Sequence, residues 1–202
     1  KYNGFDNFVI SVHYLSKKIV KYFGNGKKFN VKIKYIIEKK PYGTAGALSF
    51  LKEKTSLPVV VCNGDVLSNI NFDSLLNFHK KNKCDMSVVI RSLVSKNPFG
   101  MVKLKNNKII GFEEKKDLVM HINAGIYVIN QKMLKLIDAK KRIDMSDYIL
   151  LLIKNRKKVH SFMFNDNWID VGTKENLIHL RRLINKWEIL LQLYQQKKNQ
   201  KG

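Results

Sequence analysis

The sequence has no long hydrophobic run. No stretch of its 202 residues approaches the roughly 18 consecutive apolar residues that span a bilayer. The N-terminal residues 1–6 also lack the apolar run of a secretory signal peptide. We therefore expect no membrane insertion, and a soluble protein located in the cytoplasm.

Metal-binding patterns of cysteine and histidine are also missing. The two cysteines, Cys62 and Cys84, form no CxxC pair and have no nearby histidine that would suggest a zinc site. We interpret both as reduced structural thiols. The five histidines are scattered at no recurring spacing, so we expect each of them to be a hydrogen-bonded or exposed side chain. The sequence thus argues against a metal centre of the His/Cys type.

Acidic residues are scarce. The chain has 16 Asp and Glu against 38 Lys and Arg, which gives a net charge of +22. Such an excess is compatible with a polyanionic partner, either nucleic acid or an anionic membrane surface. However, the excess is nearly all lysine and is spread along the whole chain, without one stripe of interleaved aromatic residues. We interpret the excess charge as lysine side chains that face solvent. Nucleic-acid binding is the alternative, and it ranks last among the functions considered. Its signature would be steeply salt-dependent binding.

What the sequence does contain is an alternation of strand and helix patterns. The β-branched run Phe8–His13 is followed by Ser16, a candidate N-cap, and by a periodic helix that Gly24-Asn25-Gly26 ends. A second strand is expected at residues 31–37, a helix at 45–52 and a strand at 57–62. The last of these is apolar throughout, as in strands buried on both faces of a parallel sheet. These alternations predict an α/β fold.

The second half of the chain adds an antiparallel insertion. Residues 101–112 read as a hairpin, because Asn106-Asn107 can occupy the positive-φ positions of a tight turn. We predict the remaining strands at residues 86–90, 122–129, 159–164 and 168–171, where the last two close the sheet, and the remaining helices at 73–80, 132–137 and 146–154.

The C-terminal tail predicts an amphipathic helix. Apolar side chains recur there at three- and four-residue steps: Leu180, Leu183, Ile184, Trp187, Leu190, Leu191 and Tyr194. Packing on its own domain and a subunit interface in a homo-oligomer are both open as the partner of this face, and a membrane-surface helix is a third alternative. We divide the chain into a main domain at residues 1–176 and a helical, basic tail at residues 177–202.

Polar motifs follow the predicted strands. Residues 38–48 join a strand end to a helix start, where glycines let a ligand approach the backbone and free amide groups can face it. A turn at Gly43 and a packing contact at Gly46 are the alternatives.

Two aspartates also stand at strand ends. Asp65 follows the strand at residues 57–62 and Asp170 ends the strand at 168–171, at the sheet edge where α/β proteins bind ligands. Magnesium takes one or two carboxylates and completes its shell with phosphate and water oxygens, so this pair suits Mg²⁺. Turn formation by Asp65 and helix capping by Asp170 or Thr173 are the rival interpretations.

Taken together and in order, the motifs resemble the sugar-phosphate nucleotidyltransferases, also called nucleotide-sugar pyrophosphorylases, over residues 5–178. The resemblance rests on six segments: residues 38–48 with their PxGTAGAL pattern, 63–65, 98–100, 114–115, 123–127 and 168–172. It implies a Rossmann-like mixed, mostly parallel sheet flanked by helices, with a small antiparallel insertion and a C-terminal helix. It also implies that a nucleoside triphosphate and a sugar-1-phosphate react to give a nucleotide sugar and pyrophosphate.

The resemblance further assigns roles to residues. Asp65 and Asp170 would hold Mg²⁺, and Lys115 would bind the sugar phosphate, which makes these three the catalytic set. The resemblance implies nucleotide contacts by Glu38, Gly43, Thr44, Gly46, Asn63 and Gly64. It places Gly100, Glu114, Asn123 and Gly125 around the sugar.

Glu38 suggests which base is bound. Relatives that use thymidine or uridine nucleotides have glutamine here, whose amide can both donate and accept. An ionised carboxylate only accepts, and guanine offers it two adjacent donors. We therefore predict GTP as the substrate, with a salt bridge to Lys39 or Lys40 as the alternative role of Glu38.

The departure from the family lies at the start of the chain. Relatives carry a first strand and a glycine-rich loop with an arginine and a lysine that grip the triphosphate, and nothing before Phe8 supplies them. We expect an unpaired strand edge, and we expect these residues alone to lack the triphosphate grip. A non-catalytic relative that binds sugar nucleotides for regulation is therefore the second functional class.

Overall fold

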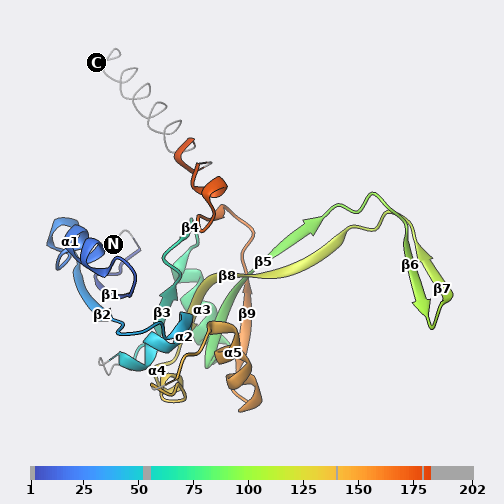
Figure 1. Cartoon of the computed structure of the whole chain (residues 1–202). Coiled ribbons are helices and arrows are strands. Elements are labelled where there is room, and N and C mark those ends of the chain that lie inside the picture. Colours follow the sequence, from blue (N-terminus) through green and yellow to red (C-terminus); the bar gives the residue numbers. More distant parts are fainter. Residues whose placement is uncertain (1–2, 52–55, 140, 179, 183–202) are drawn as a thin grey trace, which may run out of the picture. The chain divides into compact units, whose positions relative to one another are not determined.

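The computed structural model describes residues 3–51, 56–139, 141–178 and 180–182 (Figure 1). The chain forms two compact units. The first unit comprises Lys1–Cys62 and Asn71–Phe164, and the second comprises Asn63–Ile70 and Asn165–Gly202. The boundary that we place at residue 176 stays a prediction.

The first unit begins with a pair of parallel strands. β1 (Asn7–Val12) pairs with β2 (Lys32–Ile37), and the register runs from Asn7 beside Lys32 to Val12 beside Ile37. Helix α1 (Ser16–Phe23) and the 3₁₀ turn η1 (Lys27–Phe29) connect them. Both strands and the helix were predicted correctly.

The start of α1 differs from the prediction in one detail. Ser16 is the first helical residue and not the N-cap, because the chain enters the helix through Leu15 at φ 55°, with no side-chain cap. The predicted end is confirmed, since Gly24 at φ 54° and Gly26 at φ 87° take up positive φ values after the helix, and Gly26 is in the left-handed conformation.

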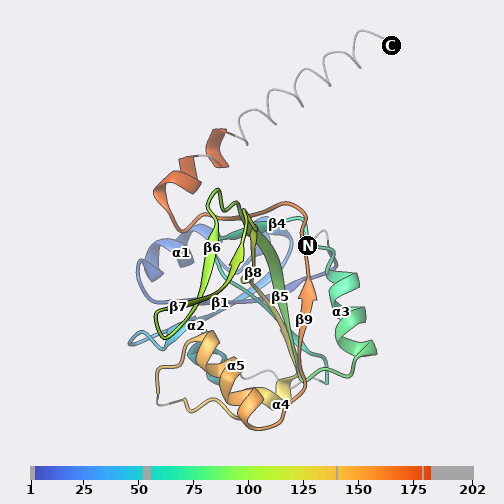
Figure 2. The same ribbon diagram turned by 90° about the vertical axis from the view of Figure 1, so that its right-hand side faces the viewer.

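A four-stranded sheet forms the centre of the first unit. Its order is β3 (Val59–Cys62), β8 (Leu118–Ile129), β5 (Met86–Ser95) and β9 (Val159–Met163). β5 and β9 run parallel and side by side (Figure 2), whereas β3 and β5 are both antiparallel to β8. The mixed α/β class is confirmed.

Strand β3 does not have the expected environment. Its continuous apolar run predicted a strand buried on both faces of a parallel sheet. Instead it is antiparallel to β8, its valines are only half-buried and Cys62 is exposed. The reason is that, among the described residues, β3 has a paired strand on one side only. β1 likewise has one paired neighbour in the described part of the chain.

Short helices carry the core of the first unit. They are α2 (Gly43–Gly46), η2 (Ala47–Phe50), α3 (Phe72–Lys81), α4 (Gln131–Leu134) and α5 (Met145–Lys154). The helix predicted at residues 45–52 is thus one α-helical turn followed by a 3₁₀ turn that ends where Leu51 becomes extended. The main buried cluster joins α2, α4 and α5 to β5 and β8 through Ala45, Met86, Val88, Tyr127, Ile129, Met133, Ile137, Met145, Tyr148 and Leu152.

The predicted hairpin is confirmed. β6 (Met101–Lys105) and β7 (Lys108–Glu113) pair antiparallel. Asn106 and Asn107 form the turn at φ 46° and 54°, the positive values that a two-residue hairpin turn needs.

The second unit contains a smaller sheet. β4 (Val66–Ser68) pairs antiparallel with β10 (Trp168–Asp170). β10 was predicted, but as a strand that closes the main sheet, whereas β4 was not predicted. A helix follows from Lys174, and the apolar residues of the predicted tail helix from Leu183 to Tyr194 lie outside the described residues. No described helix is long and apolar enough to cross a membrane.

The hydroxyl of Tyr148 is a weak point of the core. Tyr148 is fully buried, and its hydroxyl has no hydrogen-bond partner among the described residues. Burial accordingly raises its pKa. An unpaired buried hydroxyl retains its desolvation cost, so Tyr148→Phe should raise the free energy of unfolding by about 1 kcal/mol in a urea titration.

The matched control is Tyr127→Phe. Tyr127 is equally buried, but its hydroxyl accepts a hydrogen bond from Asn123 Nδ2 at 2.6 Å. Loss of this hydrogen bond in Tyr127→Phe should lower the free energy of unfolding. Destabilisation by Tyr148→Phe comparable to that of Tyr127→Phe would contradict the assignment of an unsatisfied hydroxyl.

Candidate functional site

Two predicted metal ligands converge in the second unit. Asp65 directly precedes β4, Asp170 ends β10, and Val171 N donates to Asp65 O at 2.8 Å. A Cβ atom placed on Gly172 would lie 2.9 Å from Asp170 Oδ1 and 3.2 Å from Asp65 Oδ2. Two carboxylates separated by about a hundred residues in the sequence therefore border one small space, which Gly172 keeps open.

The chemistry of this pair fits magnesium. Mg²⁺ binds through one or two carboxylates and draws its other ligands from water and substrate phosphates. Asp65 is exposed and Asp170 is half-buried, so both can meet a ligand from solvent. Within the described ranges, no group of three or more His, Cys, Asp and Glu side chains could hold a metal. A phosphate-bound cation thus fits the two carboxylates better than one enclosed by the protein.

The rival role of helix capping belongs to a neighbouring residue. Thr173 Oγ1 accepts from Asn176 N at 3.1 Å, which makes Thr173 the N-cap of the helix that follows. Asp170 Oδ1 instead accepts from Gly172 N at 2.7 Å and so fixes the direction of its own carboxylate. No described residue donates a hydrogen bond to the Asp65 carboxylate.

Gly64, a predicted nucleotide contact, has no packing role. A Cβ atom built on it would meet no other heavy atom within 4 Å. Its neighbour Asn63 closes the local turn, because Asn63 O accepts from Val66 N at 3.4 Å. Open space beside Gly64 is what the close approach of a ligand to this backbone would require.

Glu38 is held by hydrogen bonds within the first unit. Ser11 Oγ donates to Glu38 Oε1 at 2.6 Å, and Tyr42 N donates to Glu38 Oε2 at 2.9 Å. The alternative of a salt bridge is not what the structure shows. No described lysine forms an ion pair with Glu38, and the ammonium group of Lys40 lies 5.6 Å from the centroid of the Tyr42 ring.

The amide groups of the predicted nucleotide loop are engaged by the protein. Thr44 N donates to Asp144 Oδ1 at 3.1 Å, while Ala45 N and Gly46 N donate to Ile143 O at 3.1 and 3.2 Å. The expectation that free amides face a ligand is therefore wrong for these three residues. A segment distant in sequence satisfies them instead.

The same loop also accepts hydrogen bonds from the segment that binds its amides. Thr44 Oγ1 accepts from Met145 N at 2.8 Å and so caps α5, at the point where Asp144 binds back to Thr44. Gly43 has φ 82°, and a Cβ atom there would lie 2.4 Å from Ile143 O, so only glycine fits. Gly46 is buried, and its Cβ would lie 2.9 Å from Tyr42 Cβ. Both glycines have a packing role, as the alternative interpretation allowed.

The predicted sugar-binding residues form two pairs. A Cβ atom on Gly100 would lie 2.4 Å from Phe112 Cζ and 3.3 Å from Glu114 Oε2, so Gly100 and Glu114 are neighbours. On β8, Asn123 Oδ1 accepts from Gly125 N at 3.0 Å. The hydrogen bond from Asn123 to Tyr127 fixes the other end of that amide.

Lys115 lies in the connection between β7 and β8. It is exposed and has φ 43°, an uncommon conformation for a residue with a side chain. Glu113, two residues earlier, pairs with Lys103 and with Lys116, whose ammonium lies 3.3 Å away, and these contacts hold the pKa of Glu113 below its usual range. In the described part of the chain, no carboxylate pairs with Lys115. Its ammonium is thus available to an anionic ligand.

His79 is a structural histidine. It is buried, with Nδ1 at 2.8 Å from Ser87 Oγ and Nε2 at 3.2 Å from Asn130 Oδ1. Burial lowers its pKa, against the opposing influence of Asn130 and Asp85. Both ring nitrogens are used by the fold, so His79 joins no site.

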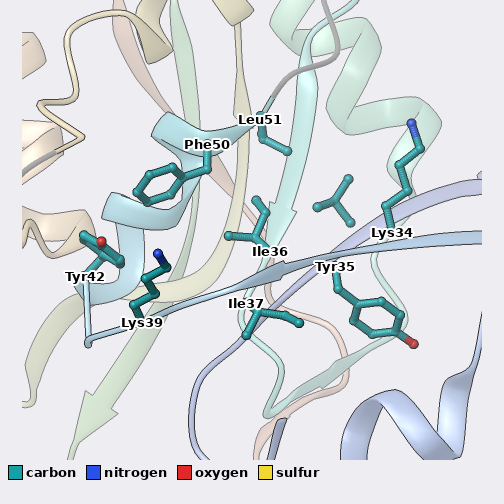
Figure 3. A pocket seen from close by; sticks show the side chains of 9 residues that line it. Lys34, Tyr35, Ile36, Ile37, Lys39, Tyr42, Phe50 and Leu51 are labelled. Atoms are coloured by element: carbon teal, nitrogen blue, oxygen red, sulfur yellow. The ribbon is translucent and has the colours of Figure 1, made fainter. Parts of the chain in front are cut away.

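A cavity of about 640 Å³ lies between β2 and the α2–η2 segment (Figure 3). Tyr42, Phe50 and Leu51 line it on one side, and the side chains of residues 34–37 line it on the other. None of the predicted site residues is among the nine that line this cavity. The cavity thus borders the predicted nucleotide loop at Lys39 and Tyr42 without including the residues assigned to nucleotide binding.

Sequence reasoning missed three residues that contact the predicted ones. They are Ser11 beside Glu38, Asp144 beside Thr44, and Phe112 beside Gly100. For Ser11 a signal existed, because parallel pairing of two predicted strands brings their carboxyl ends together. For Asp144 no local signal existed, since its partner is 100 residues away.

The space beside Gly172 yields a prediction. Gly172→Ala adds a methyl group 2.9 Å from Asp170 Oδ1 and must push the carboxylates apart. We expect the dissociation constant for Mg²⁺, measured by calorimetry with a bound nucleotide, to rise about 10-fold or more. Gly111→Ala is the control, because its Cβ would make only an ordinary contact at 3.4 Å with the Lys103 side chain. Equal Mg²⁺ affinity in the two variants would rule out a metal at this position.

Comparison with known proteins gives matches along most of the chain. A family model described as nucleotidyl transferase matches residues 1–186. The chain is 30% identical over 184 residues to a mannose-1-phosphate guanyltransferase of Yarrowia lipolytica. This alignment covers 87% of this chain and 50% of the relative. The chain is 27% identical over 175 residues to a D-glycero-alpha-D-manno-heptose 1-phosphate guanylyltransferase of Aneurinibacillus thermoaerophilus, covering 86% and 76%.

Solved structures agree in fold. A putative glucose-1-phosphate thymidylyltransferase from Bacillus anthracis matches with a TM-score of 0.64 at 24% identity, covering 87% of this chain and 74% of that one. HddC from Yersinia pseudotuberculosis matches with a TM-score of 0.62 at 19% identity, covering 88% and 78%. These matches support the Rossmann-like α/β architecture. The family match extends over most of the sequence, and the chain therefore belongs to the sugar-phosphate nucleotidyltransferase family.

Proposed function

We propose that the protein transfers a guanylyl group from GTP to a hexose- or amino-sugar-1-phosphate and so makes a GDP-sugar, a precursor for polysaccharide synthesis. The observation that carries this proposal is the convergence of Asp65 and Asp170 beside Gly172. Relatives named as guanyltransferases of mannose- and heptose-1-phosphate support it. The chain spans half the length of the Yarrowia relative, so the activity is proposed for the full-length protein. A nucleoside triphosphate substrate also suits the cytoplasmic location predicted from the sequence.

The reaction demands positioning and charge neutralisation. A phosphate oxygen of the sugar-1-phosphate attacks the α-phosphorus of GTP, the bond to the oxygen that bridges to the β-phosphorus breaks, and pyrophosphate leaves. Both reactants are anions, so the protein must hold them in line and offset their charge. Asp65 and Asp170 would hold Mg²⁺, which when bound supplies positive charge to the triphosphate oxygens.

Lys115 would bind the phosphate of the sugar substrate. Its ammonium is exposed, while its neighbour Lys116 is paired with Glu113. The unusual φ of 43° at Lys115 agrees with a functional role, since local backbone strain clusters at such sites. Gly100, Glu114, Asn123 and Gly125 would surround the sugar.

The base would be read by Glu38, with Gly43, Thr44, Gly46, Asn63 and Gly64 as the further nucleotide contacts. A carboxylate accepts hydrogen bonds from the two adjacent N–H groups of guanine, whereas thymine and uracil offer one N–H between two carbonyl oxygens. The names of the guanyltransferase relatives agree with this preference. One structural neighbour is named as a thymidylyltransferase, so the fold alone does not indicate which base is bound.

Replacement of the paired carboxylates tests the function. In full-length protein supplied with GTP, Mg²⁺ and a panel of sugar-1-phosphates, Asp65→Asn and Asp170→Asn should each lower the rate of pyrophosphate release by about 100-fold or more, because a metal ligand is lost. Asp73→Asn, in the first turn of α3, is the control and should retain the rate. Circular dichroism checks that all variants are folded.

Each alternative gives a different result in this experiment. A near-normal turnover rate of either the Asp65→Asn or the Asp170→Asn variant would refute the assignment of these residues as metal ligands. Binding of sugar nucleotides by the wild type without pyrophosphate release would favour the non-catalytic, regulatory relative.

Lys115 and Lys116 form a matched pair for a second test. Lys115→Ala should raise the KM for the sugar-1-phosphate about 10-fold and leave the KM for GTP nearly unchanged, because only one anion loses its cation. Lys116→Ala removes an equal charge from the neighbouring position and should change neither constant beyond about twofold. Equal effects of the two substitutions on steady-state kinetics would count against a specific role of Lys115.

A further inference from the structure

The parallel pairing of β1 and β2 fixes the backbone around Glu38. Ser11 lies beside Ile36 and Val12 beside Ile37 in the register. Immediately beyond the strands, Glu38 N donates to Val12 O at 2.9 Å. His13 Nδ1 lies 3.0 Å from Glu38 O and must donate, because a carbonyl oxygen only accepts. Glu38 is thus anchored through both its backbone amide and its carbonyl.

The side chain of Glu38 is anchored as well. Ser11 Oγ reaches Glu38 Oε1 at 2.6 Å, in the range of charge-assisted hydrogen bonds, and Tyr42 N reaches Oε2 at 2.9 Å. An ionised carboxylate has about four acceptor positions, so one hydrogen bond per oxygen leaves each oxygen able to accept another. Glu38 is half-buried and keeps contact with solvent, so a ligand can approach its carboxylate from that side.

We infer that Ser11 is a specificity-positioning residue, which with the amide of Tyr42 orients the Glu38 carboxylate to accept two parallel N–H donors of a guanine base. The inference rests on the proposed function, because it concerns the base of the same substrate. Fixing the carboxylate before the ligand arrives removes the entropy loss that a free glutamate would suffer on binding. Ser11 itself does not contact the base.

The choice between GTP and ITP isolates this contact. Guanine presents its ring N–H and an exocyclic amine side by side, whereas hypoxanthine has the same ring N–H and no amine. The ratio of the two dissociation constants therefore measures the second hydrogen bond to Glu38. A substitution that only destabilises the fold weakens the binding of GTP and of ITP equally, and therefore leaves the ratio of the two dissociation constants unchanged.

The experiment measures the Kd of GTP and of ITP for full-length protein by competition with a fluorescent nucleotide. Wild type should prefer GTP by roughly 10-fold, as expected for one hydrogen bond to a charged group. Glu38→Gln should abolish the preference. Ser11→Ala should reduce it several-fold, Ser11→Thr should preserve it because the hydroxyl remains, and Ser95→Ala, an exposed serine of β5, should match wild type.

Ser11→Cys provides a second variant should Ser11→Ala fail to fold. The thiol is nearly the same size but a weak donor, so it too should reduce the preference. A GTP preference that is lost in Glu38→Gln but intact in Ser11→Ala and Ser11→Cys overturns the role of Ser11 and leaves base recognition by Glu38 standing. A wild type that binds GTP and ITP equally overturns base recognition by Glu38, and the inference with it.

Discussion

Main-chain pairing between distant segments is the constraint on which the candidate metal site and the surroundings of Glu38 depend. Pairing of β4 with β10 brings Asp65 and Asp170 to the same side of Gly172. Pairing of β1 with β2 brings Ser11 to Glu38. Neither arrangement needs a special local motif, because strands in register deliver the side chains at their ends to a common edge.

The elements that sequence predicts best are those with a local cause. The Asn106-Asn107 turn and the glycines after α1 follow from backbone conformations that few residues tolerate. Strand partners have no such local signature. The apolar run that becomes β3 looks the same whether its neighbours are parallel or antiparallel, and β4 is too short to give any periodic pattern.

For the candidate sites, the sequence indicated which residues are important, but it was a less reliable guide to the role of each residue. Gly43 and Gly46 stand in a ligand-type motif, yet each is also required by a close contact with the protein, and the amides after Gly43 bind residues 143 and 144. Gly64 shows the opposite case, since nothing in the structure crowds it. A glycine in a motif can thus serve packing, ligand approach or both, and only the surroundings of its missing Cβ distinguish these roles.

The reciprocal hydrogen bonds of Thr44 and Asp144 have a consequence for how this sequence can evolve. Asp144 Oδ1 accepts from the amide of Thr44 and Thr44 Oγ1 accepts from the amide of Met145, so loss of either side chain leaves one backbone donor unpaired in the other segment. A side chain that can accept a hydrogen bond is therefore favoured at position 44 and at position 144. Across a set of relatives, both positions should keep such acceptor side chains to join the two segments, although 99 residues separate them in the chain.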